Sequence, residues 1–174
     1  FTALERAKEQ GIGHYFVPRY TRVVDTVESK DNINKAYNLI STSKVRNEMI
    51  VDDVITCITR KQTPVILTRF KEHAKFLYDA LKGKADHVFL LYGDNSDKEN
   101  TEIRGRLKQV PGSESLVLVA TGQKIGEGFD FPRLDVLMLA APVSFEGRLE
   151  QYVGRLNRDY VGKEAVYVYD YIDS

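Results

Sequence analysis

The chain has 174 residues, of which 43% are hydrophobic and 29% charged, a composition typical of one soluble globular domain with a sizeable core. Lys plus Arg and Asp plus Glu number 25 each, so the formal net charge is zero and bulk charge gives no support to nucleic-acid binding. A single cysteine, Cys57, excludes an internal disulfide framework and fits a reducing intracellular compartment such as the cytoplasm. Its apolar neighbours predict a packing role for its side chain.

The sequence lacks the marks of a membrane or secreted protein. No apolar run approaches the length of a membrane span, and no signal peptide is present, so we expect no membrane partner. The chain begins at Phe1 rather than at a methionine. This start indicates a piece of a longer protein, and motifs that are missing here are expected to lie outside it.

The first third of the chain predicts two short helices, an extended segment and one longer helix. Residues 2–10 and 31–40 are expected to be the short helices. Residues 14–28 are rich in Tyr, Val and Thr and predict an extended segment, which Pro18 confines to an edge strand or a connecting arm. Residues 43–59 place apolar side chains at helical spacing and predict the longer helix.

From residue 64 onwards, short apolar runs alternate with helical patterns. The expected strands are residues 64–68, 87–92, 115–120, 135–140 and 165–169. The expected helices between them are residues 71–82, 97–108 and 146–160. Strands that are apolar on both faces and alternate with helices predict an α/β fold, with a mainly parallel sheet covered by helices on both faces. Open sheets of this kind bind ligands at the carboxyl ends of their strands.

The helix expected near residue 151 has a polar face. At helical spacing Gln151, Arg155 and Arg158 fall on one side, next to Gly154, and apolar side chains fall on the other. The guanidinium of arginine can donate two hydrogen bonds to one phosphate, so this face is suited to binding a polyphosphate. The alternative is a solvated basic face on an ordinary amphipathic helix.

A glycine-rich loop follows the strand that ends near Ala120. It reads Thr-Gly-Gln-Lys-Ile-Gly-Glu-Gly-Phe-Asp-Phe-Pro over residues 121–132. Exposed backbone N–H groups after a strand can cradle phosphate, with a hydroxyl from Thr121 and a charge from Lys124. Asp130 can accept a hydrogen bond from a ribose or hold an arginine of the polar helix. The alternative is a glycine-rich turn without a ligand.

Together the two stretches resemble motifs V and VI of superfamily 2 helicases, closest to the DEAD/DEAH-like enzymes of the XPB and restriction-enzyme type. The matching pattern is Ala-Thr-x4-Gly-Glu-Gly-Phe-Asp-x-Pro, a hydrophobic strand, and then Gln-x-x-Gly-Arg-x-x-Arg. Pro-Val-Ile-Leu-Thr-Arg-Phe from residue 64 is similar to motif IV. The resemblance runs from about residue 64 to 170. Residues 1–60 resemble only loosely the connection between two motor lobes, so we divide the chain into 1–60 and 61–174.

The resemblance implies the second RecA-like lobe of an ATP-driven nucleic-acid motor, a P-loop NTPase-type three-layer sandwich. It implies that Arg155 and Arg158 face the ATP phosphates, with Arg158 as the arginine finger, and that Gln151 positions the γ-phosphate or the attacking water. The residues that it places at the nucleotide are Gly128, Asp130 and Gly154. The residues that it places on the nucleic-acid backbone are Thr68, Arg69, Thr121, Gly122 and Lys124. The expected polymer is DNA, with RNA left open.

Half of the expected ATP site is missing from the sequence. No Gly-x4-Gly-Lys-[Ser/Thr] loop is present, and Asp52-Asp53 is expected to be a solvated helix face rather than a magnesium-binding motif. ATP and Mg²⁺ would therefore require a first RecA-like lobe upstream of Phe1, and we expect the fragment alone to be inactive. His14, His73 and His87 lack metal-ligand spacing, so no metal site is expected, and His73 is expected on a helix surface.

Two other classes of function remain open at this point. The first is a non-catalytic RecA-like module that binds nucleic acid or protein. The second is a Rossmann-like nucleotide-binding enzyme such as a glycosyltransferase, which would bind nucleotide tightly without a partner lobe.

Overall fold

Six parallel strands and three helices make up the framework of the computed structural model, which describes residues 13–21, 39–121, 131–141 and 165–173. The strands are β1 (Gly13–Tyr20), β2 (Pro64–Thr68), β3 (His87–Leu91), β4 (Leu116–Thr121), β5 (Val136–Leu139) and β6 (Ala165–Ile172). The helices are α3 (Lys44–Thr59), α4 (Lys71–Leu81) and α5 (Asp97–Gln109). Apart from β1, each agrees with a predicted element to within about three residues, which is the usual uncertainty of element ends. β1 covers the first part of the extended segment predicted over residues 14–28, and residues 22–28 of that segment lie outside the described residues.

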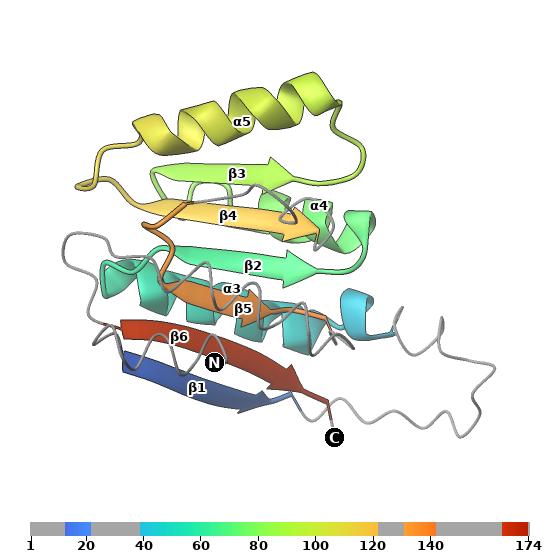
Figure 1. The fold of residues 1–174 in the computed structure, drawn as a ribbon. Helices are drawn as coiled ribbons and strands as arrows, with labels where there is room; N and C mark the ends of the chain where they lie inside the picture. Colours follow the sequence, from blue (N-terminus) through green and yellow to red (C-terminus); the bar gives the residue numbers. More distant parts are fainter. Residues whose placement is uncertain (1–12, 22–38, 122–130, 142–164, 174) are drawn as a thin grey trace, which may run out of the picture.

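The sheet has the order β1-β6-β5-β2-β4-β3, and every neighbouring pair runs parallel. Figure 1 shows the six strands side by side with their arrowheads pointing the same way. β1 is an outer strand of the described sheet, as Pro18 predicts, because proline has no backbone N–H to donate and is tolerated in sheets mainly at outer strands. The parallel sheet predicted from the apolar runs is therefore confirmed.

Each face of the sheet has its own hydrophobic core. On one face Ile66, Val119 and Met138 pack with buried residues of α3 and α4. On the opposite face, strand residues that include Leu118 pack with Leu107 of α5. This places helices on both sides and gives the three layers expected from the sequence (Figure 1).

Two of the helices begin after a serine whose side chain caps the first turn. The Ser43 hydroxyl accepts from the backbone N–H of Arg46 at 3.3 Å at the start of α3. Ser96 and Glu99 form a reciprocal capping box at the start of α5. Residues 39–42 are also helical, at the end of the short helix expected over 31–40. The helices expected over residues 2–10 and 146–160 lie outside the described residues.

The prediction that Asp52 and Asp53 form a solvated face is wrong for Asp53. Its carboxylate accepts from Arg19 Nε and from the Tyr171 hydroxyl, both at 2.9 Å, and its side chain is only 13% exposed. Helical spacing alone could not reveal this, because both partners come from strands at the far ends of the chain. Asp52 is exposed, as predicted.

Cys57 is fully buried, which confirms its predicted packing role. Burial raises the pKa of its thiol to about 11 and that of the neighbouring Tyr169 hydroxyl to about 12. A thiol held in its protonated form is a poor nucleophile and a poor metal ligand. Cys57 is therefore part of the core under α3 and not a reactive group.

The amino edge of the sheet is held by Arg133. Its guanidinium donates to Thr63 Oγ1 at 3.2 Å and to the carbonyls of Val110, Pro111 and Glu114. These bonds tie the segments that lead into β2, β4 and β5. The amino edge is thus held together by structural hydrogen bonds. Ligand chemistry is expected at the opposite, carboxyl edge of the sheet.

Candidate functional site

The carboxyl ends of the strands meet at one edge because the whole sheet is parallel (Figure 1). Thr68 and Thr121 end the neighbouring strands β2 and β4 and are paired in register. Both are nearly buried, with 3% and 6% exposure, whereas Arg69 is exposed. The structure therefore brings together three of the residues that the resemblance places on a nucleic-acid backbone.

The Thr68 hydroxyl belongs to a buried chain of hydrogen bonds that runs through His73 and Asn47 to the Ser41 carbonyl. It lies 2.7 Å from His73 Nδ1, and His73 Nε2 lies 2.8 Å from Asn47 Oδ1. Asn47 in turn donates through Nδ2 to the Ser41 carbonyl at 2.9 Å. Because the Asn47 oxygen can only accept, His73 must carry its proton on Nε2, and Nδ1 then accepts from the Thr68 hydroxyl.

The prediction that His73 lies on a helix surface is wrong, because its side chain is 2% exposed. Desolvation, and then the nearby charge of Arg46, lower its pKa to about 4. The ring is therefore neutral at physiological pH, as the hydrogen-bond chain requires. The hydroxyl hydrogen of Thr68 is therefore bonded to His73 Nδ1 and is not available for donation to a ligand.

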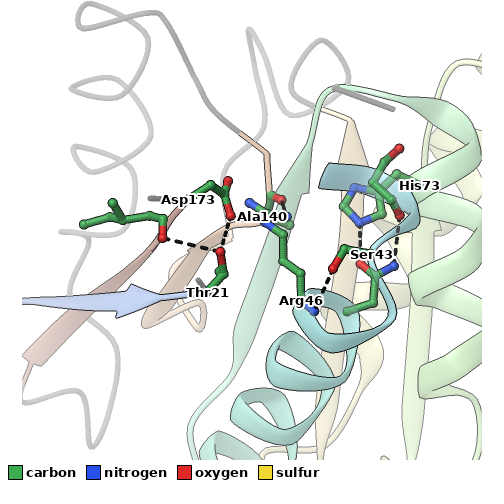
Figure 2. A network of polar contacts seen from close by, with 9 residues as sticks. Thr21, Ser43, Arg46, His73, Ala140 and Asp173 are labelled. Carbon is green, nitrogen blue, oxygen red and sulfur yellow. Dashed lines mark hydrogen bonds and ion pairs between the residues drawn. The ribbon is translucent and has the colours of Figure 1, made fainter. Parts of the chain in front are cut away.

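A second network at the same edge is built around Arg46 (Figure 2). Arg46 Nε donates to Asp173 Oδ1 at 2.9 Å, and Nη1 donates to the carbonyl of Ala140. Asp173 also accepts from the Thr21 hydroxyl. The guanidinium thereby joins the segments that follow β1, β5 and β6 to the first turn of α3.

Arg46 is fully buried, and within the described part of the chain its Nη2 has no hydrogen-bond partner. A buried guanidinium that keeps donor capacity is uncommon, because the desolvation cost is usually offset by full hydrogen bonding. Arg46 was not among the site residues predicted from the sequence. The available signal was its position four residues before Ile50, on the apolar stripe of its helix.

The residues expected at ATP lie outside the described residues. These are Gln151, Gly154, Arg155, Arg158, Gly128 and Asp130. Gly122 and Lys124, expected on the nucleic acid, also lie outside them. Ala140 and Ala141, which lead towards the expected polar helix, are buried at the carboxyl edge.

Two features are absent from the described residues. Those residues bring no three His, Cys, Asp or Glu side chains together in a way that could hold a metal ion. The described helices also include none that is long and apolar enough to cross a membrane.

Comparison with curated proteins finds poxvirus relatives. The chain is 27% identical over 172 residues to transcript termination protein A18 of Yaba-like disease virus, covering 92% of this chain and 35% of that protein. It is 30% identical over 132 residues to the A18 protein of fowlpox virus, covering 74% of this chain and 28% of that protein. The chain thus spans about a third of the length of these relatives. No family model matches the sequence.

Comparison with solved structures finds T4 UvsW and two ATPase domains. T4 UvsW superposes with a TM-score of 0.65 and 22% identity, over 93% of this chain and 32% of that chain. The Sulfolobus solfataricus SWI2/SNF2 ATPase core in complex with dsDNA gives a TM-score of 0.57 and 15% identity, over 92% and 41%. The C-terminal part of the Fun30 ATPase domain gives 0.59 and 11%, over 77% and 42%. These likenesses, together with the parallel sheet, show that the chain has the RecA-like α/β fold.

Proposed function

We propose that this chain is the C-terminal motor lobe of an ATP-dependent DNA helicase or translocase of superfamily 2, of the XPB and restriction-enzyme type. The observation that carries the proposal is the position of Thr68, Arg69 and Thr121. The helicase-like motifs place these residues on nucleic acid, and they lie together at the carboxyl edge of a RecA-like sheet. Two of the structural neighbours are ATPase domains, and one of these is in complex with dsDNA.

The grip on nucleic acid is proposed to be electrostatic and independent of base sequence. Arg69 is exposed and lies directly after the strand end, where its guanidinium can reach a phosphate. The Thr68 hydroxyl donates to His73, so Thr68 would act through its backbone or as a wall beside the phosphate. Gly122 and Lys124 are proposed to continue the same path.

ATP is proposed to bind between this lobe and a first lobe elsewhere in the full-length protein. Arg155 and Arg158 would stabilise the charge that develops on the transferred phosphoryl group, and Gln151 would orient the attacking water. Gly128, Asp130 and Gly154 would line the nucleotide. An arginine supplied across a cleft raises the rate of phosphoryl transfer by roughly 10³–10⁵ in GTPases. Mg²⁺ would be held by ATP and by the first lobe.

The curated relatives are transcript termination proteins, so we infer that the whole protein works on DNA in transcription, inside the cell. RNA is the alternative polymer. Discriminating between them requires measuring which of the two stimulates ATP turnover by the full-length protein.

The decisive experiment is ATP turnover by the full-length protein with and without DNA. Arg158→Ala is expected to lower DNA-stimulated turnover by about 10³-fold or more while leaving the thermal unfolding midpoint unchanged. Arg60→Ala is the matched control, because Arg60 is exposed and lies at the end of α3, next to the amino edge of the sheet. Wild-type turnover by Arg158→Ala would refute the arginine-finger assignment.

The second candidate is a RecA-like module that binds nucleic acid or protein without catalysis. Both candidates account for the lack of a Gly-x4-Gly-Lys-[Ser/Thr] loop within these 174 residues, because the motor proposal assigns that loop to another lobe. The two candidates differ in the full-length protein: the module would bind DNA but show no DNA-stimulated ATP turnover.

A further inference from the structure

A groove of about 1120 Å³ lies between α3 and α4, on the face of the sheet opposite α5. Its α3 wall runs from Lys44 to Asp52, and its α4 wall runs from Glu72 to Ala80. Each wall spans nine residues, and eight rises of 1.5 Å between the first and the last make the groove about 12 Å long. That length accommodates roughly two turns of a third helix.

The middle of the groove is apolar and accessible. Val51 and Ala80 line it, and the Phe76 side chain is 54% exposed at its wall. The polar side chains at its floor are Asn47 and His73, which bond to each other and to neighbouring groups. A bound segment would therefore gain little binding free energy from polar contacts at the floor. It would bind there through apolar side chains.

The rim of the groove is acidic. Glu48, Asp52 and Glu72 contribute three carboxylates, against the single ammonium of Lys44. The Lys44–Glu48 contact is long at 3.9 Å, and both side chains are largely exposed, so it neutralises little of this charge. Neutral His73 adds no positive charge at physiological pH. The rim repels phosphate and attracts Lys and Arg.

We propose that this groove is a docking site for a basic amphipathic helix of a partner protein. Apolar side chains spaced along one face of that helix would sit over Val51 and Phe76, and flanking Lys or Arg side chains would pair with the acidic rim. Helix-in-groove recognition uses this combination of spaced anchors and a charged border. One end of the groove lies beside the carboxyl edge, because Phe70 and Glu72 of its lining follow Arg69 closely in the chain.

The site can be tested without the natural partner and without ATP, so its outcome is independent of the motor proposal. The probe is a synthetic amphipathic helical peptide built from Leu and Lys, titrated into the 174-residue chain and followed by fluorescence anisotropy. A peptide with Glu in place of every Lys is the charge control. We expect the Leu/Lys peptide to bind at least about tenfold more tightly than the Leu/Glu peptide.

Variants locate the binding on the surface. Phe76→Ala and Asp52→Lys are each expected to weaken Leu/Lys binding by about tenfold or more, because one removes an exposed apolar contact and the other reverses a rim charge. The matched controls are Val45→Ala, at an exposed apolar residue of α3 outside the groove, and Glu102→Lys, on α5. Both controls are expected to bind like the wild type.

Three results would overturn the proposal. The first is equal affinity for the Leu/Lys and Leu/Glu peptides, which would show unspecific apolar adhesion. The second is equal weakening by the control variants, which would place binding elsewhere. The third is a dimer in sedimentation that Phe76→Ala dissociates, which would show that a second copy of this chain fills the groove.

Discussion

His73 shows how one buried side chain gives the protein a pH dependence. Its folded pKa of about 4 lies below the usual value of 6.5, so the unfolded chain takes up a proton that the folded chain refuses. The stability that comes from the neutral ring is complete above pH 6.5 and is lost as the pH falls towards 4. The hydrogen bonds to Thr68 and Asn47 make the neutral form the one that fits.

The unfolding free energy is therefore expected to fall by about 2 kcal/mol between pH 7 and pH 5 on account of this residue. Urea unfolding at several pH values measures the change. His73→Gln should be less stable at pH 7 but should show a much flatter pH dependence. His87→Gln, at a partly exposed histidine, is the control and should keep the slope. An unaltered slope in His73→Gln would contradict the assignment.

Arg69 is the described residue best placed to test the nucleic-acid grip. Arg69→Ala in the full-length protein is expected to weaken DNA binding similarly for all sequences. It should also reduce the dependence of log K on log salt by about one unit, as for the loss of one phosphate contact. Fluorescence anisotropy at several salt concentrations measures both quantities. Arg60→Ala should leave the salt slope unchanged, and an unchanged slope in Arg69→Ala would remove Arg69 from the proposed path.

The environment of a side chain could be predicted from the sequence where residues close to it in the chain determine its burial. Cys57 is buried because its own helix face is apolar. His73 and Asp53 were misplaced because their partners lie on other elements, and helical spacing contains no information about them. Arg46 was overlooked for the same reason, since its partners Asp173 and Ala140 come from the other half of the chain.

At the scale of elements, α3 is fastened to the edge of the sheet by a polar bridge. Asp53 on α3 accepts from Arg19 on β1 and from Tyr171 on β6. The Tyr171 hydroxyl is largely buried, and its pKa is raised by desolvation and by the adjacent carboxylate. It therefore remains a hydrogen-bond donor throughout the physiological range.

Asp53→Ala is expected to lower the unfolding free energy by about 2 kcal/mol, because it leaves the buried Tyr171 hydroxyl without its acceptor. The neighbouring Asp52→Ala is a matched control on an exposed carboxylate and should change stability by less than about 0.5 kcal/mol. Chemical denaturation compares the two variants directly. Equal effects would mean that the bridge contributes nothing beyond surface charge.

Prediction of elements from the sequence was most complete where apolar runs are short and sharply bounded. β2 agrees residue for residue with the expected strand, because Thr63 precedes it and the polar Arg69 follows. β6 is longer than expected, because its last residues alternate Tyr with Asp and pair with β1. The order of strands in the sheet was not predicted, since it depends on crossovers between distant segments.

At the scale of the whole molecule, the RecA-like fold is shared with T4 UvsW and two ATPase domains, whose chains are about two to three times longer. The described carboxyl edge offers threonines and an exposed arginine but no group of carboxylates for Mg²⁺. On the motor proposal, this lobe completes an ATP site whose other half lies on another lobe.

The 174-residue chain is accordingly expected to show no DNA-stimulated ATP hydrolysis above background, whereas the full-length protein should turn over ATP. A coupled phosphate-release assay with both proteins measures this difference. Turnover by the short chain at a rate comparable to that of the full-length protein would show that the site is complete within these residues.

The pairing of β1 with β6 has a consequence for how the protein is made. Gly13 lies beside Ala165 and Tyr20 beside Ile172, so the first of the described strands has its neighbour in the described sheet in the last of them. During synthesis, β6 emerges after the other described strands. Until then β1 carries exposed aromatic side chains and an unpaired backbone, features that favour aggregation and chaperone binding. Among the described strands, β1 is therefore the one that remains unpaired for the longest part of synthesis.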